Sequence, residues 1–172
     1  MALTFRKLHP HFVGESSPVE LRKAHDEETL AQIRVGMDEY AVLVFHDQVF
    51  SDAEQLAFGE RLDGRLHQGA GSRAFTKSRL GNEALSDISN LDANGDIMKA
   101  DDRRRQYGLG NRLWHTDASF QDPAGRYSML HARVVPPVAA DTEFADMRAA
   151  YDALREDLER LTLERFTGTV NA

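Results

Sequence analysis

The chain contains no cysteine among its 172 residues. This absence excludes disulfides, thiolate metal sites, iron–sulfur clusters and cysteine nucleophiles, because each of these needs a thiol. A protein without disulfides suits a reducing compartment, and we expect it in the cytoplasm.

Long hydrophobic runs are missing as well. No stretch approaches the roughly 20 apolar residues of a membrane-spanning helix. The opening MALTFRKLHPHFV has charges and a proline where a signal peptide needs an apolar run. Basic charge is not in excess either, since the net charge is −7. We therefore predict that neither nucleic acid nor a membrane is a partner. A small anionic substrate is still allowed, since it needs only a few basic groups in one pocket.

The length and the 41% apolar content are those of one soluble domain with a real core. Apolar periodicity predicts a helix over residues 27–40, and Ser51 with Glu54 form a capping-box motif that predicts a helix start. A further helix is expected at about 146–162, and residues 63–83 and 91–110 are expected to be irregular. Strands are expected at 3–8, 11–14, 41–45, 84–90, 112–117, 127–135 and 141–144.

A histidine and an aspartate stand two positions apart in the sequence NRLWHTDASF, which covers residues 111–120. On a strand, His115 and Asp117 would project from one face. The neighbouring Trp114 and Phe120 predict a half-buried pocket around them. With one more histidine, such a pair forms the facial triad that holds non-haem iron(II). The motif alone is short, so a polar pair on a solvated strand remains the alternative.

The surrounding sequence carries a family resemblance. Residues 111–137, NRLWHTDASFQDPAGRYSMLHARVVPP, and residues 141–154, DTEFADMRAAYDAL, resemble the taurine/α-ketoglutarate (TauD/TfdA-type) dioxygenases. The 2,4-dichlorophenoxyacetate dioxygenase branch is the most similar, and DISN at 87–90 fits it too. The resemblance implies a mixed α/β, mainly β fold: a double-stranded β-helix, or jelly roll, with flanking helices. It also implies Fe(II), with 2-oxoglutarate and O2 as cosubstrates.

Several residues match positions to which the family gives a role. The resemblance implies that His115 and Asp117 bind the metal and are catalytic, and that Thr142 contacts 2-oxoglutarate. Asn111 matches a residue near the substrate. Lys99 and Arg73 lie in segments where substrate-contacting loops of the family occur, and we expect them to bind an acidic group.

Two of the family's residues have no counterpart here. The resemblance places a third ligand, a histidine, and a 2-oxoglutarate-binding arginine well downstream of the aspartate, whereas the last histidine of this chain is His131. We therefore expect residues 1–172 to be the N-terminal portion of a single TauD/TfdA-type domain, with an incomplete jelly roll. Whether these 172 residues act alone is left open.

The predicted function is hydroxylation of a carbon next to an ether oxygen or sulfur of a small anionic, aryloxyalkanoate-like substrate, giving succinate and CO2. Degradation of aromatic herbicides is chemistry of this kind. The alternative is a catalytically incomplete remnant that acts as an interaction or metal-binding module, and a homo-oligomer remains open. A cupin-like protein that uses Zn(II) or Mn(II) is a weaker third option. The arginines at 103–105 are expected to form ion pairs with Asp101 and Asp102 in a solvated loop, rather than a basic lid.

Overall fold

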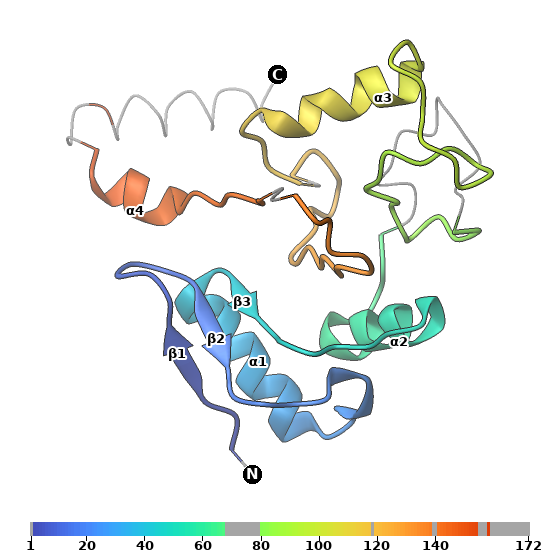
Figure 1. Cartoon of the computed structure of the whole chain (residues 1–172). Helices are drawn as coiled ribbons and strands as arrows, with labels where there is room; N and C mark the ends of the chain where they lie inside the picture. Colours follow the sequence, from blue (N-terminus) through green and yellow to red (C-terminus); the bar gives the residue numbers. More distant parts are fainter. Residues whose placement is uncertain (1, 68–79, 118, 139–140, 155–157, 159–172) are drawn as a thin grey trace. The chain divides into compact units, whose positions relative to one another are not determined.

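The computed structural model describes residues 2–67, 80–117, 119–138, 141–154 and 158 (Figure 1). The chain divides into two compact units, one with residues 1–19, 27–46 and 133–172 and the other with residues 20–26 and 47–132. None of the described helices is long and apolar enough to cross a membrane. The elements are β1 (Phe5–Lys7), β2 (Gly14–Ser16), η1 (Leu21–Lys23), α1 (Glu27–Tyr40), β3 (Leu43–Val44), α2 (Asp52–Asp63), α3 (Arg103–Gly108), η2 (Leu109–Arg112) and α4 (Met147–Asp152).

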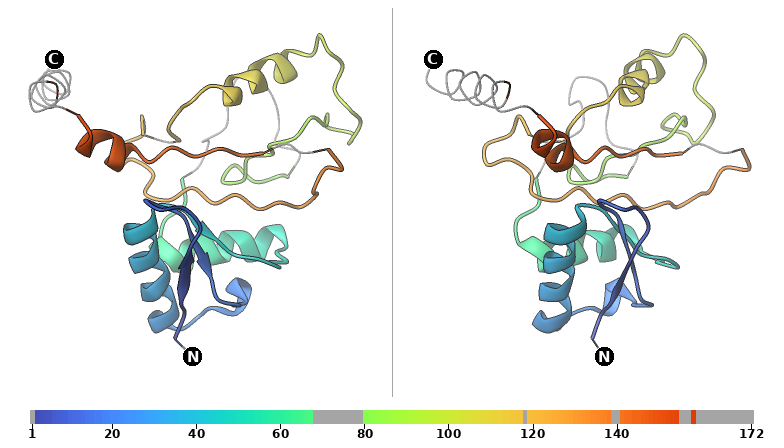
Figure 2. Two further views of the ribbon diagram at one scale, coloured as in Figure 1. Left: turned by 60° about the vertical axis from the view of Figure 1, so that its left-hand side comes forward. Right: turned by 90° about the vertical axis from the view of Figure 1, so that its left-hand side faces the viewer.

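The first unit contains a three-stranded sheet with the order β1-β2-β3. Strand β1 is antiparallel to β2, with Phe5 opposite Ser16, and β2 is parallel to β3, with Gly14 opposite Leu43. Helix α1 lies alongside this sheet (Figure 2). The strands expected near the N-terminus and after the helix are thus present, although each is shorter than or shifted from its predicted range.

Helix α1 covers the range that the periodicity predicts. Its buried residues are Leu30, Ile33, Gly36 and Tyr40, at steps of three and four, so one stripe of the helix faces the core. Two glutamates in its first turn complement the positive end of the helix dipole. The sequence predicts this helix correctly because the apolar pattern is local and repeats along the helix.

Glycine at position 36 allows the helix to approach the sheet closely. A Cβ there would lie 2.7 Å from Cε2 of Phe5, which is closer than side-chain atoms can pack. Similarly, a Cβ on Gly14 in β2 would lie 2.8 Å from Cγ of Tyr40. The helix and the sheet can therefore meet at this distance only because neither glycine has a side chain.

Arg148 attaches helix α4 to the C-terminal end of α1 within the same unit. Its Nη1 donates to the Asp38 carbonyl at 2.6 Å and its Nη2 to the Glu39 carbonyl at 3.3 Å. The last carbonyls of a helix have no partner within the helix, and a cation is favourable there. The Asp146 side chain caps the start of α4 by accepting from the Arg148 backbone N–H at 3.0 Å. This contact fixes the start of α4. The helix ends at Asp152, before the predicted end at about 162, and residues 155–157 and 159–162 of the predicted range lie outside the described ones.

The second unit is organised around α2, whose predicted capping box is confirmed. The Ser51 hydroxyl accepts from the Glu54 N–H at 3.3 Å, and the Glu54 carboxylate accepts from the Ser51 N–H at 2.8 Å. Phe58 is almost fully buried on this helix. Arg61 donates through Nε to the Ala24 carbonyl at 3.1 Å and so joins α2 to the segment that follows η1.

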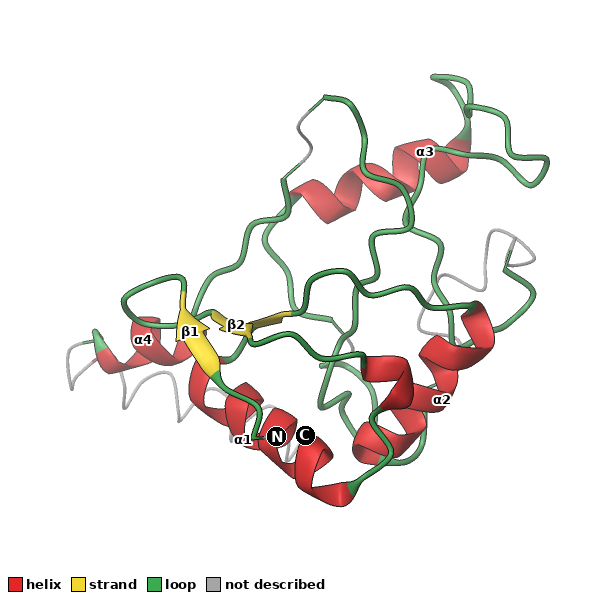
Figure 3. Ribbon diagram, turned by 60° about the horizontal axis from the view of Figure 1, so that its bottom comes forward, coloured by secondary structure: helices red, strands yellow, loops and turns green. Residues whose placement is uncertain are grey.

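The strands expected at 84–90, 112–117, 127–135 and 141–144 are absent from the described part of the chain. Their composition favours β-structure, but a strand exists only where a neighbouring strand receives its hydrogen bonds. The stretch at 91–110 was expected to be irregular and instead contains the short helix α3. Figure 3 shows how much of the chain runs as loop. The described residues therefore form a mixed α/β structure with a small sheet, and a jelly roll is not visible among them.

Burial is distributed very unevenly along the chain. The buried apolar residues are Leu21, Ala24, Leu30, Ile33, Tyr40, Phe58 and Met98. After Met98, none of the described residues is buried. Helix α4 therefore has no buried residue, and Met147 is strongly exposed.

We expect Gly36→Ala to destabilise the protein by about 1–3 kcal/mol, because the added methyl group overlaps the Phe5 ring. This loss should exceed the gain of up to ~1 kcal/mol that alanine brings to a helix interior. Urea unfolding of the two proteins measures the difference. Gly108→Ala in α3 is the control, since a Cβ there meets nothing within 4 Å. A Gly36→Ala variant as stable as the parent would show that the close contact is not required.

Candidate metal site

His115 and Asp117 lie on the segment that follows η2. The backbone leaves this short helix at Leu113, with φ −91° and ψ 145°, and residues 114–116 belong to no helix or strand. The two side chains nevertheless converge, with 3.4 Å between His115 Nε2 and Asp117 Oδ1. The predicted pairing is thus present, but an extended loop produces it rather than a strand.

The orientation of the His115 ring is set by a backbone contact. Its Nδ1 lies 2.7 Å from the Leu113 carbonyl oxygen. A carbonyl only accepts, so Nδ1 carries the proton, and in the neutral ring the lone pair is on Nε2. Histidines that bind metals are commonly held in this way. The Nε2 lone pair and the Asp117 carboxylate therefore face one another, and this set of donors suits a ferrous or similar divalent ion.

The pair is not enclosed. The side chains of His115 and Asp117 are 48% and 56% exposed, while Trp114 is 71% and Phe120 79% exposed. The prediction that these aromatic residues shelter the pair is therefore wrong for the described structure. Among the residues that the structure describes, no group of three or more His, Asp or Glu side chains is arranged to hold a metal ion. His115 and Asp117 are thus the two donors that the described residues supply at this position.

The other predicted site residues are placed as follows. Asn111 lies in η2, four residues before His115, and is exposed. Thr142 belongs to the other unit and lies exposed on the segment that leads into α4. Arg73 falls outside the described residues.

Lys99 lines a pocket of about 510 Å³ in the second unit. The other lining residues are Asp92, Asp96, Ile97, Met98, Asp101 and Asp102. Carboxylates repel an anion, and an anionic group at Lys99 would have four of them around it. This environment opposes the prediction that Lys99 binds an acidic substrate.

The arginine cluster at 103–105 is partly explained by an ion pair. Asp102 caps α3 by accepting from the Arg104 N–H at 2.8 Å, and its carboxylate also accepts from Arg104 Nη2 at 2.6 Å. Hydrogen bonds from the Arg104 side chain and backbone lower the pKa of Asp102 from 3.8 to about 2. The predicted ion pairing is therefore confirmed for Arg104, although it occurs on a helix rather than in a loop. Arg105 donates to the Met98 carbonyl at 3.4 Å.

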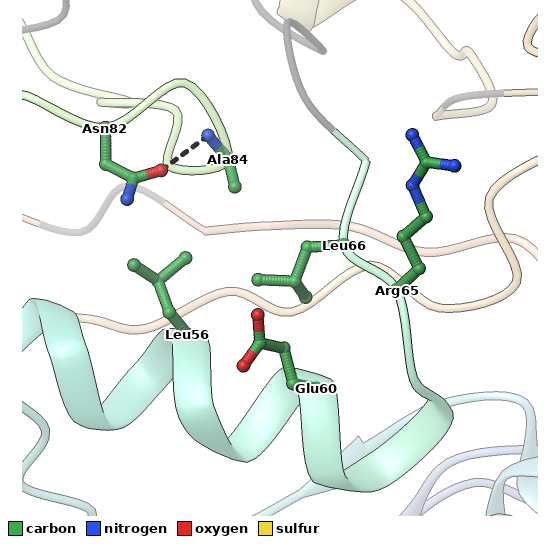
Figure 4. Close-up of a pocket in the computed structure, with 6 residues that line it drawn as sticks. All are labelled: Leu56, Glu60, Arg65, Leu66, Asn82 and Ala84. Carbon is green, nitrogen blue, oxygen red and sulfur yellow. Dashed lines mark hydrogen bonds between the residues drawn. The ribbon is translucent and has the colours of Figure 1, made fainter.

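A second pocket, of about 200 Å³, was not foreseen from the sequence. Leu56 and Glu60 of α2 line it together with residues 65–66, Asn82 and Ala84 (Figure 4). The Asn82 side chain is held in place because its oxygen accepts from the Ala84 N–H at 2.8 Å. No sequence motif links these residues, since only the fold brings them together.

The profile of the family described as "Taurine catabolism dioxygenase TauD, TfdA family" matches residues 4–170. The chain belongs to the TauD/TfdA family. A relative from Cupriavidus pinatubonensis, the alpha-ketoglutarate-dependent 2,4-dichlorophenoxyacetate dioxygenase, is 43% identical over 92% of this TauD/TfdA chain and 55% of its own length. The (S)-phenoxypropionate/alpha-ketoglutarate-dioxygenase of Sphingobium herbicidovorans is 36% identical over 70% of this chain and 37% of its own.

A solved structure gives the same result. This chain is 40% identical to AAD-2, whose crystal structure was solved in complex with Mn(II) and N-oxalylglycine. The TM-score is 0.78, and the match covers 93% of this chain and 52% of the AAD-2 chain. The family resemblance inferred from the sequence is therefore confirmed. This TauD/TfdA chain spans about half the length of the relatives that it matches.

We expect Arg104→Gln to raise the pKa of Asp102 from about 2 toward 3.8, because its strongest hydrogen-bond donor is lost. NMR titration of the carboxyl carbon measures the shift. Because the folded pKa is lowered, Asp102 stabilises the parent above pH ~4 and loses this effect as the pH falls toward ~2. Arg112→Gln removes the same charge nearby and should leave the Asp102 pKa unchanged. Equal pKa values in both variants would contradict the assignment.

Proposed function

We propose that this TauD/TfdA chain provides the proximal metal ligands of an Fe(II)- and 2-oxoglutarate-dependent dioxygenase. The substrate would be a small anionic, aryloxyalkanoate-like compound, hydroxylated next to an ether oxygen or sulfur, with succinate and CO2 as coproducts. The observation that carries the proposal is the 3.4 Å convergence of His115 and Asp117, in a chain 43% identical to a 2,4-dichlorophenoxyacetate dioxygenase.

Each residue has a defined part in this proposal. His115 would bind iron through Nε2 while its Nδ1–H stays on the Leu113 carbonyl, and Asp117 would add a negatively charged oxygen ligand. Bound iron supplies the oxidising chemistry with O2 and 2-oxoglutarate. The Thr142 hydroxyl would donate to a 2-oxoglutarate carboxylate. Asn111 and Arg73 would contact the substrate; Lys99 has the weakest case of the proposed contacts.

The alternative function is an interaction or metal-binding module without turnover. It is favoured by the exposure of the pair and by the presence of only two donors among the described residues. Water would occupy more of the metal's coordination positions than in a site with three protein ligands. The jelly roll, the single domain over 1–172 and the cytoplasmic location remain predictions.

The two functions are separated by metal binding and turnover, measured on the same protein. We expect the chain to bind Mn(II), followed by electron paramagnetic resonance, and His115→Ala to weaken this binding by at least about tenfold, as losses within metal sites commonly do. His46→Ala is the control, because that exposed histidine pairs with Glu15 at 2.8 Å, outside the site. Succinate formation from Fe(II), 2-oxoglutarate and a panel of aryloxyalkanoates and alkylsulfonates tests the enzyme.

The outcomes are distinct. Succinate formation that depends on His115 supports the dioxygenase. Metal binding that depends on His115 without any succinate supports the module. If His115→Ala binds Mn(II) as well as the parent, the metal assignment is wrong for both.

A further inference from the structure

Helices α3 and η2 form one continuous helical rod over residues 103–112, which ends shortly before His115 (Figure 1). Gly108 and Leu109, where the two elements meet, both have right-handed helical dihedral angles, with φ of −59° and −65° and ψ of −19° and −21°. A rod of this length spans about 15 Å. Whatever holds its first turn therefore also determines where its far end lies.

Two side chains hold the start of the rod on the segment that precedes it. Arg105 donates through Nη1 to the Met98 carbonyl at 3.4 Å, and Gln106 donates through Nε2 to the Ala100 carbonyl at 2.8 Å. Arg104 is instead engaged by Asp102 within the helix cap. Of these two arginines, Arg105 is thus the one that joins the rod to residues before the helix.

The carbonyl that Arg105 contacts belongs to a fixed part of the chain. Leu91 and Ile97 form an antiparallel bridge, and the Met98 N–H donates to the Asn90 carbonyl at 2.8 Å, which closes a hairpin over residues 90–98. Met98 is only 8% exposed. Arg105 therefore attaches the rod to a residue that is both hydrogen-bonded and buried.

The far end of the rod orients the His115 ring. The Leu113 N–H donates to the Gly110 carbonyl at 3.0 Å and so caps the rod, and the Leu113 carbonyl lies 2.7 Å from His115 Nδ1. A tilt of the rod would move the carbonyl that holds the ring. The hairpin, the rod and His115 all belong to the second unit.

We propose that Arg105 is a positioning residue for His115. By holding the start of the rod on Met98, it fixes the Leu113 carbonyl at the other end, and with it the Nδ1–H tautomer that leaves the Nε2 lone pair facing Asp117. Its guanidinium offers several donors in a planar fork and is always charged, so the contact persists over a wide pH range. The orientation is a property of the metal-free protein; only its consequence for a metal rests on the proposed function.

The His115 tautomer is measured by nitrogen-15 NMR of the full 172-residue chain, labelled at histidine, without metal and at pH ~8.5, where histidine rings are neutral. In the parent, Nδ1 should give the signal of a protonated ring nitrogen and Nε2 that of an unprotonated one. Arg105→Ala should lower the Nδ1–H fraction to about half or less, because a ring that is no longer held can carry its proton on either nitrogen. Arg105→Lys keeps a charged donor and should restore most of the parent signal.

Arg112→Ala is the matched control. It removes the same charge from the same rod at a position nearer to His115, and Arg112 makes no hydrogen bond or ion pair with the described residues. An effect of charge alone would therefore be at least as large in Arg112→Ala, whereas we expect this variant to keep the parent tautomer. Circular dichroism and urea unfolding show whether each variant is folded.

The proposal is overturned if folded Arg105→Ala keeps the Nδ1–H tautomer of the parent, or if Arg112→Ala changes it as much. Should Arg105→Ala not fold, Gln106→Ala takes its place in both comparisons, because it removes the other, exposed attachment of the rod. A matching loss in Mn(II) affinity of about threefold or more is expected for Arg105→Ala. If the parent does not bind Mn(II), the proposed function fails, while the tautomer still decides this inference.

Discussion

The contact between the His115 ring and the Leu113 carbonyl is the constraint on which the functional interpretation depends. At 2.7 Å it fixes the proton on Nδ1 and directs Nε2 toward Asp117. A backbone carbonyl two residues away can do this because the chain is extended after η2. Without that contact the ring could rotate, and the pair would be two neighbouring polar residues rather than two convergent donors.

The site lies in the part of the chain that is least packed. The buried apolar residues all precede residue 99, whereas the pair follows at 115 and 117. Burial of apolar surface is the main stabilising term in folding, so we expect the early elements to be more stable than the segment that carries His115 and Asp117. Metal affinity should then depend on how well that segment is ordered, because a ligand pair binds best when its geometry is held in advance.

The helices were more predictable than the strands, and the reason is physical. A repeating apolar stripe in the sequence predicts helix α1, and the Ser51–Glu54 capping box predicts the start of α2. Helix α3 has no apolar stripe, only an Asp102 cap and three arginines, and it was missed. Strand prediction failed at 112–117 and 127–135 because β-structure needs a partner that local sequence does not contain.

The sequence alone determined the family, the pairing of His115 with Asp117 and the two long helices, because each is encoded by residues close together along the chain. The tertiary structure decided what the distant parts do. It placed Arg148 on the carbonyls at the end of α1, 109 and 110 residues away, and joined α2 to residues 82–84 around a pocket. It also left Trp114 and Phe120 in solvent where the sequence predicted shelter. A side chain is buried only when other parts of the protein pack over it, and its neighbours in sequence do not determine which parts do so.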